Sequence, residues 1–422
     1  MTATDPITRA VERRMCTGCG ACAALAPDAI RMVEDPATGL RPVVARGAEA
    51  ARSARRVASA CAGIAADRRP LPVNDALDER WGPVLAVWEA HAADEEIRFR
   101  GSSGGAVTAL ALHLVEAGEV AAVAHVAASA DDPRRNEGVV STDREGLLRG
   151  CGSRYAPASA CGRLGDIAAS DAPHALIGKP CDVASATRAR ATDPRLSNLA
   201  VTIAIFCAGT PSGAGTEALL DSLGKPKGAR LVDLAYRGRG WPGPMRAAWD
   251  EGEGRTTESR HLTYAEGWGG ILQKTRPWRC RICTDHTGVF ADVSVGDPWH
   301  KPPAGAPTAG RSLVVARSRR GVRLVEDAIR TGRLVAERVT RETLDAAQPN
   351  LVDAHASAYG RRLAMRLAAL PVPEEAGFPG FRLWWRHLSA RRRIASLAGT
   401  FRRIAARRLW RPERIAGGEA AR

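Results

Sequence analysis

Three cysteines near residue 20 constrain the fold of this chain more than any other feature. Cys16, Cys19 and Cys22 have the spacing C-x2-C-x2-C, and three thiolates at this spacing wrap around a [4Fe–4S] cluster. Bacterial ferredoxins continue with three residues and a Cys-Pro pair, but this chain has Ala26-Pro27 there. The fourth ligand must come from farther away, and we expect Cys61. A zinc site is the alternative, although zinc usually takes two separated pairs.

The ten cysteines of the chain are expected to stay reduced. Residues 1–15 contain no apolar segment typical of a secretory signal, and no run of about 18 uncharged apolar residues predicts a membrane-spanning helix. These features favour the cytoplasm. In that compartment, clustered cysteines are more often metal ligands than disulfide partners.

Two further cysteines directly follow predicted strands. Cys181 comes after the apolar run 175–178, and Cys207 comes after the apolar run 199–206. The carboxyl ends of parallel strands meet at one edge of a sheet, where α/β proteins build their sites. We therefore expect these two thiols to approach one another.

A C-x2-C pair, Cys280 and Cys283, brings this second group to four thiolates, the number that a second [4Fe–4S] cluster needs. The alternative is that the cysteines after the strands are small buried residues without a ligand role. Two cysteines remain, Cys151 and Cys161, and we expect neither to bind metal.

Strands and helices alternate through the middle of the chain, which favours an α/β fold with a parallel layer. We expect a ferredoxin-like iron–sulfur segment, then a mixed α/β core in two parts, and then a helical, arginine-rich tail. The corresponding ranges are 1–70, 80–165, 166–335 and 336–422. A proline-containing linker at 68–83 separates the first segment from the core.

A glycine-rich loop, Gly101-Ser-Ser-Gly-Gly105, precedes a predicted apolar helix that ends at Gly118. Glycines permit close backbone approach, and the start of a helix supplies free N–H groups for a phosphate. The loop matches neither G-x-G-x-x-G nor a P-loop. A tight turn required for packing therefore competes with a nucleotide-binding role.

Seven motifs occur in an order that resembles the beta-subunit family of coenzyme F420 hydrogenases and dehydrogenases. They are SSGGAVTAL, GSRYAPA, GKPCDVA, FCAGTPS, RGRGWPG, CRICTD and ADVSVGDPW. The resemblance extends from about Cys16 to His300, and the family also contains ferredoxin-dependent reductases of chlorophyll metabolism. One departure is Cys61-Ala-Gly, where the family often has Cys-Pro-Gly.

The resemblance implies a flavin, usually FAD, beside one or two [4Fe–4S] clusters. One cluster, nearest the flavin, would be held by Cys181, Cys207, Cys280 and Cys283. The other would be held by Cys16, Cys19, Cys22 and Cys61. The flavin would lie on the loop residues Ser102, Ser103, Gly104 and Gly105. Arg154 and Lys179 are further candidates for its phosphates or ring edge, with surface ion pairing as their alternative role.

These parts predict an oxidoreductase that relays electrons from a ferredoxin or similar one-electron carrier, through two clusters, to a flavin that reduces a small organic molecule. The first alternative is an electron-transfer subunit that oxidises or reduces coenzyme F420 within a larger complex. The second is a non-enzymatic zinc-binding module. Candidate proton donors at the substrate are His91, Asp285 and His300.

Most of the net charge of +15 comes from one segment, since residues 382–414 contain eleven Arg and one acid, Glu413. Ile394, Leu397, Phe401 and Ile404 are spaced to share one helical face. The tail is therefore expected to be a surface helix packed on the body, a contact with the inner membrane face, or a docking site for an acidic partner such as a ferredoxin. We expect no nucleic-acid binding, because no motif for it is present. In each case the tail would be peripheral to the clusters.

Overall fold

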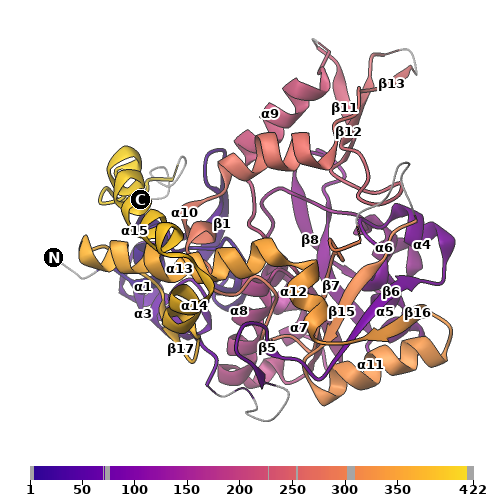
Figure 1. The fold of residues 1–422 in the computed structure, drawn as a ribbon, viewed down its shortest axis with the longest axis horizontal. Coiled ribbons are helices and arrows are strands. Elements are labelled where there is room, and N and C mark those ends of the chain that lie inside the picture. Colours follow the sequence, from indigo (N-terminus) through magenta and orange to yellow (C-terminus); the bar gives the residue numbers. More distant parts are fainter. Residues whose placement is uncertain are drawn as a thin grey trace.

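The structure, a computed structural model, describes residues 4–69, 71, 77–226, 228–252, 255–301 and 309–415. At its centre lies an eight-stranded sheet with the order β16-β6-β15-β14-β10-β9-β7-β8 (Figure 1). In that order, the strands are Leu334–Val339, Ala86–Ala92, Ser312–Ala316, Val293–Gly296, Leu199–Ile205, His174–Gly178, Ala122–Ala128 and Asn136–Ser141.

The sheet is mixed, so the expected parallel layer is correct for only its centre. Strands β14, β10, β9 and β7 run parallel. The pairs β7–β8, β14–β15, β15–β6 and β6–β16 are antiparallel. The short connection from β7 to β8 explains one of these differences, because a parallel crossover needs a dozen or more residues.

Helices cover both faces of the sheet. Helices α5 (Ala106–Glu116) and α11 (Arg319–Arg330) pack on one face, and α8 (Pro180–Thr192) packs on the other. In strand β15, successive side chains point to opposite faces of the sheet. Val314 and Ala316 join the core under α5 and α11, while Leu313 and Val315 face the opposite core.

The N-terminal segment packs against α8 and the adjoining face of the sheet. Leu25 and Ile30 share a core with Val183 and Ala186 of α8. The segment consists of α1 (Pro6–Glu12), α2 (Ala21–Leu25), the antiparallel pair β1 (Ile30–Asp35) and β2 (Gly39–Val44), α3 (Ala48–Val57), η1 (Ala58–Ala60) and β3 (Ala65–Asp67). The linker expected at 68–83 lies partly outside the described residues.

A smaller three-stranded sheet stands beside the central one (Figure 1). It has its own core around Trp249, Tyr236 and Leu220. Its elements are α9 (Gly213–Leu223), β11 (Arg230–Ala235), β12 (Arg246–Asp250), β13 (Thr256–Glu258), the π-helix η4 (Ala265–Ile271) and η5 (Leu272–Thr275).

The remaining short elements connect these layers. They are β4 (Leu77–Asp78), β5 (Gly82–Pro83), α4 (Glu95–Arg100), α6 (Arg144–Arg149), η2 (Ala160–Arg163), α7 (Leu164–Ala168), η3 (Pro194–Leu196), α10 (Trp278–Arg281) and α12 (Glu342–Ala347).

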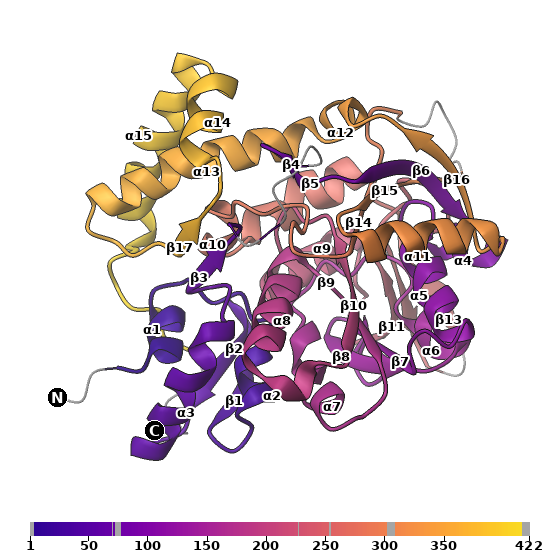
Figure 2. The ribbon, with the colours of Figure 1, turned by 90° about the horizontal axis from the view of Figure 1, so that it is seen from below.

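The C-terminal region joins the N-terminal segment to the core. It contains α13 (Pro349–Leu367), β17 (Glu374–Ala376), α14 (Gly380–His387) and α15 (Ala390–Arg407), and β17 pairs with β3 (Figure 2). Ile404 and Leu409 share a core with Met15 of the N-terminal segment and with Trp278 and Ile282 of the α10 region. This packing agrees with the alternative of a surface helix packed on the body, and it places α15 against the segment that carries the first cysteine group. Residues 416–422 lie outside the described residues.

The buried face of α15 also differs from the predicted one. Ser396, Gly399, Thr400 and Ile404 are buried, whereas Ile394 is 66% exposed and Phe401 is 40% exposed. Of the predicted apolar stripe, only Ile404 is buried, and Leu397 is half-buried. The helix rests on α13 through small residues, which let two helices approach closely.

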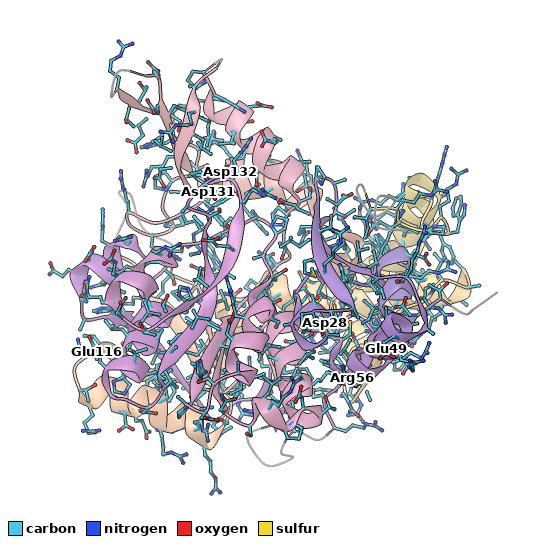
Figure 3. The ribbon with its side chains drawn as sticks, turned by 180° about the vertical axis from the view of Figure 1, so that it is seen from behind. Asp28, Glu49, Arg56, Glu116, Asp131 and Asp132 are labelled. Carbon is cyan, nitrogen blue, oxygen red and sulfur yellow. The ribbon has the colours of Figure 1, made fainter. Side chains whose placement is uncertain are left out.

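Charged side chains cover the outer surfaces of several elements (Figure 3). Glu116, at the end of α5, pairs with Arg333, and Asp132 in the β7–β8 connection pairs with Arg134 at 2.8 Å. Within the described ranges, no helix combines the length and the apolar character required to span a bilayer.

The packing of α15 predicts a contrast between two isoleucines of one helix. Replacing Ile404 with Ala should lower the free energy of unfolding by about 2–4 kcal/mol, because it leaves a cavity between the tail and the N-terminal segment. Ile394→Ala, on the exposed side, should change it by less than about 0.5 kcal/mol. Anaerobic urea unfolding of both variants measures the difference. Equal effects would show that the tail does not hold these segments together.

Candidate functional site

The first cysteine group converges on one cavity beside the central sheet. Its four side chains line this cavity together: Cys16, Cys19, Cys22 and Cys61. Gly18 and Gly20 have φ values of +73° and +87°, which L side chains rarely adopt, so the backbone can turn between the cysteines. Cys61 follows η1 directly and is brought to the other three by the packing of η1 on α8 and α2.

Burial disfavours free thiolates in this group. It raises the pKa of Cys61 to about 12, and the neighbouring Cys19 and Cys16 add to the effect. The pKa of Cys22 is raised for the same reasons. Cys19 is the exception, because a hydrogen bond from Cys161 lowers its pKa to about 6. A bound cation would favour the thiolate form of Cys22 and Cys61 as well, since metal ligation deprotonates a thiol.

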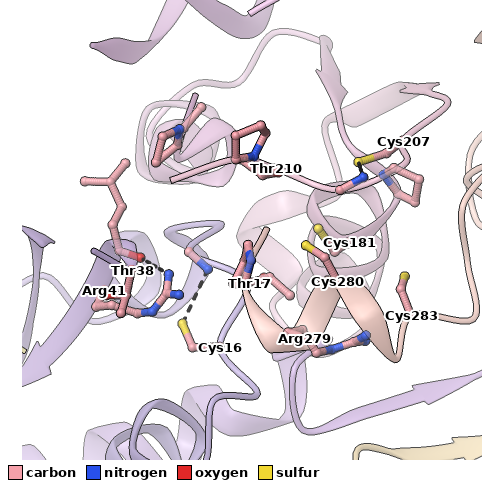
Figure 4. Close-up of a pocket in the computed structure, with 18 of the residues that line it drawn as sticks. Cys16, Thr17, Thr38, Arg41, Cys181, Cys207, Thr210, Arg279, Cys280 and Cys283 are labelled. Carbon is pink, nitrogen blue, oxygen red and sulfur yellow. Dashed lines mark hydrogen bonds between the residues drawn. The ribbon is translucent and has the colours of Figure 1, made fainter. Parts of the chain in front are cut away.

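The second cysteine group lies where two parallel strands end. Cys181 is in the first turn of α8, directly after β9, and Cys207 follows β10. Cys280 in α10 and Cys283 just after it approach from the other side (Figure 4). All four line one pocket, so the structure brings this predicted set together as well.

The thiols of the second group are also buried. Burial raises the pKa of Cys207 to about 12 and that of Cys283 to about 11. Sulfur atoms here already accept or donate hydrogen bonds. The Gly209 N–H donates to Cys207 Sγ at 3.3 Å, and Cys283 Sγ donates to the Asp285 carbonyl at 3.1 Å.

A buried arginine lies between the two cysteine groups. Arg279 is 6% exposed, and its guanidinium donates to the carbonyl of Ala62, next to Cys61, at 3.3 Å. Its Nε has no hydrogen-bond partner. Burial lowers its pKa, but the charges of Cys283, Glu375, Cys181 and Cys280 outweigh burial and raise it overall. Arg279 thus offers a positive charge to whatever the second group binds.

Within the described residues, no three His, Cys, Asp or Glu side chains converge in the way that a single metal ion requires. One zinc ion holds its sulfur ligands about 2.3 Å from a common centre. In a [4Fe–4S] cluster each thiolate binds a different iron, so the four sulfurs lie farther apart.

The two cysteine groups face one another. Cys16, Thr17 and Gly18 line the pocket of the second group as well as the cavity of the first (Figure 4). Residues of the second pocket in turn line a wide cleft of about 1610 Å³, counting the part open to solvent. The shared residues are Ala158, Cys207, Gly209, Thr210 and Pro211. The three spaces therefore follow one another in order.

The glycine-rich loop forms part of the cleft wall. Ser103 Oγ is 2.9 Å from Ser312 Oγ, and the Gly104 N–H donates to the same oxygen at 3.0 Å. A Cβ on Gly104 would lie 2.8 Å from the Ala90 carbonyl, so the loop also packs tightly, as one of the two alternatives predicted. Ser102 Oγ lines the cleft without a hydrogen-bond partner. It lies before α5, whose first N–H groups have no side-chain cap.

Arg154 and Lys179, the two basic candidates, are held differently. Arg154 Nε donates to Asn136 Oδ1 at 2.8 Å, Nη1 donates to the Leu234 carbonyl at 2.8 Å, and Nη2 donates to the Pro133 carbonyl. All three nitrogens are engaged with the protein, so Arg154 positions the loops around the cleft.

Lys179 lies in the cleft wall beside a buried carboxylate. Its Nζ is 2.7 Å from Asp182 Oδ2. Burial alone would lower the pKa of Lys179, but the Asp182 carboxylate outweighs burial and keeps that pKa above its ordinary value. Asp182 is fully buried, and its second oxygen, Oδ1, has no partner. This pair presents both a charge and an unsatisfied acceptor at the cleft.

An ion pair between Arg237 and Asp297, which the sequence analysis did not predict, lies in the wall of the cleft. Arg237 donates to Asp297 through Nη2 at 2.7 Å and Nη1 at 3.0 Å, and Trp241 Nε1 donates to Asp297 at 2.8 Å. The guanidinium also lies over the rings of Tyr264 and Trp299. Both charged residues belong to the quoted motifs RGRGWPG and ADVSVGDPW. The motifs were a signal, but the contact between them depends on the fold.

None of the three predicted proton donors lines the cleft. His91 Nδ1 is 2.9 Å from the Ala92 carbonyl oxygen, and His300 Nε2 is 2.9 Å from Glu89 Oε1. Asp285 accepts backbone N–H groups, including that of Gly288 at 2.7 Å. Each of these side chains is hydrogen-bonded within the protein instead, His91 and Asp285 to nearby backbone and His300 to a distant strand.

The two cysteine groups predict separable losses of iron. The anaerobically purified chain should contain about eight irons, and Cys61→Ala or Cys280→Ala should each reduce this to about four. Cys151→Ala, in a thiol that lines none of the three spaces, is the matched control and should retain all of them. Iron and acid-labile sulfide analysis measures the outcome. Zinc without sulfide would contradict both assignments.

Arg279 predicts a change in reduction potential. Arg279→Gln should make the second cluster harder to reduce, by on the order of 100 mV, because one nearby positive charge is lost in a medium of effective dielectric about 20. Arg279→Lys keeps the charge and should shift the potential less. Redox titration followed by electron paramagnetic resonance measures both variants. A shift to higher potential in Arg279→Gln would oppose this role.

Two family descriptions match the chain. Residues 87–164 match the N-terminal part of the beta subunit of coenzyme F420 hydrogenase/dehydrogenase, and residues 172–342 match its C terminus. Together they cover more than half of the chain, including all four cysteines of the second group. The first cysteine group and the tail lie outside both matched ranges.

A curated relative and a solved structure agree with this match. The coenzyme F420 hydrogenase subunit beta of Methanococcus voltae is 25% identical over 308 residues, which is 69% of this chain and 99% of the relative. A chain of the F420-reducing [NiFe] hydrogenase complex from Methanosarcina barkeri has the same fold, with a TM-score of 0.53 and 18% identity over 72% of this chain and 98% of that chain. This chain therefore belongs to the family of coenzyme F420 hydrogenase and dehydrogenase beta subunits, which are parts of oxidoreductases.

Proposed function

We propose that this chain is an electron-transfer subunit that exchanges electrons between a one-electron carrier and coenzyme F420, through two [4Fe–4S] clusters and a flavin. The observation that carries the proposal is the order of the three spaces. The cavity of the first cysteine group adjoins the pocket of the second through Cys16, and that pocket adjoins the cleft through Cys207.

The eight cysteines would hold the clusters as thiolates. Burial raises the pKa of Cys22, Cys61, Cys207 and Cys283, so binding of iron to these thiols would release their protons. Arg279 would offset part of the negative charge of the second cluster. Cys161 would hold Cys19 in place through its thiol and through its backbone N–H, which donates to the Cys19 carbonyl at 2.9 Å.

The cleft fits a flavin by three features of the chain. Ser102 Oγ and the uncapped start of α5 offer donors to a phosphate. Lys179 offers a fixed positive charge to an electron-rich ring edge. Tyr264, Trp268 and Trp299 provide an aromatic wall. Arg154 is left out of the proposed contacts because the protein already uses its donors.

When bound, a flavin accepts or gives electrons singly on the cluster side and in pairs on the substrate side. The chain itself would bind, orient and supply protons. Lys179 keeps its proton because of Asp182, and Tyr155 reaches the cleft with its hydroxyl 3.4 Å from Arg237 Nη1. Arg237, fixed by Asp297, would orient an anionic substrate group.

Coenzyme F420 is favoured over an unidentified organic substrate because the family and the curated relative are both described by it. Reduction of another organic molecule with electrons from a ferredoxin remains the second candidate. The feature that favours it is the first cysteine group, which lies outside the matched ranges and suits a one-electron donor.

Turnover of coenzyme F420 tests the proposal. The anaerobically purified chain should contain flavin and should reduce coenzyme F420 with reduced methyl viologen as the electron source, followed by the absorbance of the oxidised coenzyme. Cys280→Ala should lower the rate of coenzyme F420 reduction at least tenfold, because loss of the second cluster removes the step that passes electrons to the flavin. If the chain holds flavin and iron but reduces only other acceptors, such as a nicotinamide, the assignment of coenzyme F420 is wrong.

A further inference from the structure

Five arginines from three parts of the fold gather beside the cysteine sites. We call them the arginine patch: Arg276, Arg281, Arg361, Arg403 and Arg407. They come from the segment around α10, from α13 and from α15, which adjoin one another in Figure 1. Arg403 and Arg407 are exposed, and the other three are half-buried.

A shared apolar core fixes these elements beneath the patch. Trp278 and Ile282 of the α10 region pack with Met365 of α13 and Ile404 of α15. Trp278 Nε1 donates to Met365 Sδ at 3.0 Å. Above this core, Arg361 Nη1 donates to the Arg281 carbonyl at 2.6 Å. The patch is therefore a defined surface and not a set of independent side chains.

The charges of the patch are not neutralised within the part of the chain that the structure describes. None of the five arginines forms an ion pair there, whereas the neighbouring Arg392 pairs with Asp353 at 2.6 Å. Burial, together with the charges of Arg403 and Arg276, lowers the pKa of Arg361 to about 10. The guanidinium groups thus repel one another, and acidic groups supplied from outside would relieve this repulsion.

The patch borders both proposed clusters. A Cβ on Gly209 would lie 2.5 Å from Arg276 Cδ and 3.2 Å from Cys280 Cβ, so the stem of Arg276 runs beside a ligand of the second group. At the other end of the patch, the charge of Arg14, two residues before Cys16, is near enough to lower the pKa of Arg407. A protein seated on the patch would therefore place a redox centre close to either cluster.

We propose that the arginine patch docks an acidic one-electron carrier protein of the ferredoxin class. This inference rests on the proposed function and adds the entry point for its electrons. In each encounter the carrier would lose one electron, and a cluster of this chain would gain it. Positive charge facing an acidic partner raises the association rate and sets orientation, and salt weakens it. Arg276 and Arg281 lie within the matched family range, whereas Arg361, Arg403 and Arg407 lie beyond its end at residue 342.

The test compares two double variants of the full-length, cluster-loaded chain. Arg403→Gln with Arg407→Gln removes two charges from the patch. Arg386→Gln with Arg391→Gln removes two exposed charges elsewhere, since Arg391 lies about 18 Å from Arg403 along the axis of α15. The measured quantity is kcat/KM for flavin reduction by a purified, reduced acidic [4Fe–4S] ferredoxin at several salt concentrations, with reduced methyl viologen as the small reductant.

We expect the patch variant to lower kcat/KM for ferredoxin about tenfold at low salt, to approach the unaltered chain at high salt, and to keep the methyl viologen rate. The control should match the unaltered chain throughout. Equal losses in both variants, or no loss in the patch variant, would overturn the docking surface alone. A chain without flavin or iron would instead overturn the proposed function.

The same variants decide between a protein partner and other anionic surfaces. Binding to anionic phospholipid vesicles or to RNA is measured for both variants. If that binding requires Arg403 and Arg407 while flavin reduction by ferredoxin does not, the proposal is wrong. Ferredoxin-dependent reduction that alone responds to these arginines supports it.

Discussion

The parallel pairing of β9 with β10 determines where the redox chemistry of this chain can take place. Gly178 pairs with Ala204, so the two strands leave the sheet at the same edge. Cys181 and Cys207 follow within three residues of those positions. Every other part of the site is arranged around this edge. The helix α10 brings Cys280 and Cys283 to it, the N-terminal segment brings Cys16, and the glycine-rich loop forms the far wall of the adjoining cleft.

Local sequence predicted the first cysteine group through its ligand spacing, apart from Cys61. Local sequence alone was weak evidence for the second group, which depended largely on the order of the family motifs. It could not predict the mixed sheet, whose antiparallel pairs join strands far apart in the chain, such as β6 and β15. It also missed the contact of Arg237 with Asp297, which are 60 residues apart. The side-chain roles of Arg154 and His300 depend on similar long-range partners.

The tail shows why hydrophobic periodicity chose the wrong helical face. A Cβ on Gly360 of α13 would lie 2.1 Å from Ser396 Oγ, so the two helices touch through their smallest residues. Such a contact buries little apolar area and has no apolar stripe in the sequence. Ile394 and Phe401 of α15 project outward, and Arg393 of α15 lies above the exposed ring of Trp385 in α14, 4.2 Å from its centroid.

The basic character of the tail therefore has two separate physical consequences. Where arginines meet acids, they attach the tail to the body: Arg392 pairs with Asp353, and Glu413 lies within 3.7 Å of both Arg14 and Arg41 beside the first cysteine group. Where they meet only one another, as around Arg361, they leave positive charge unneutralised at the surface. A net charge of +15 alone cannot distinguish these cases. The distinction comes from the packing of α10, α13 and α15, which places the arginines without acidic partners next to the cysteines.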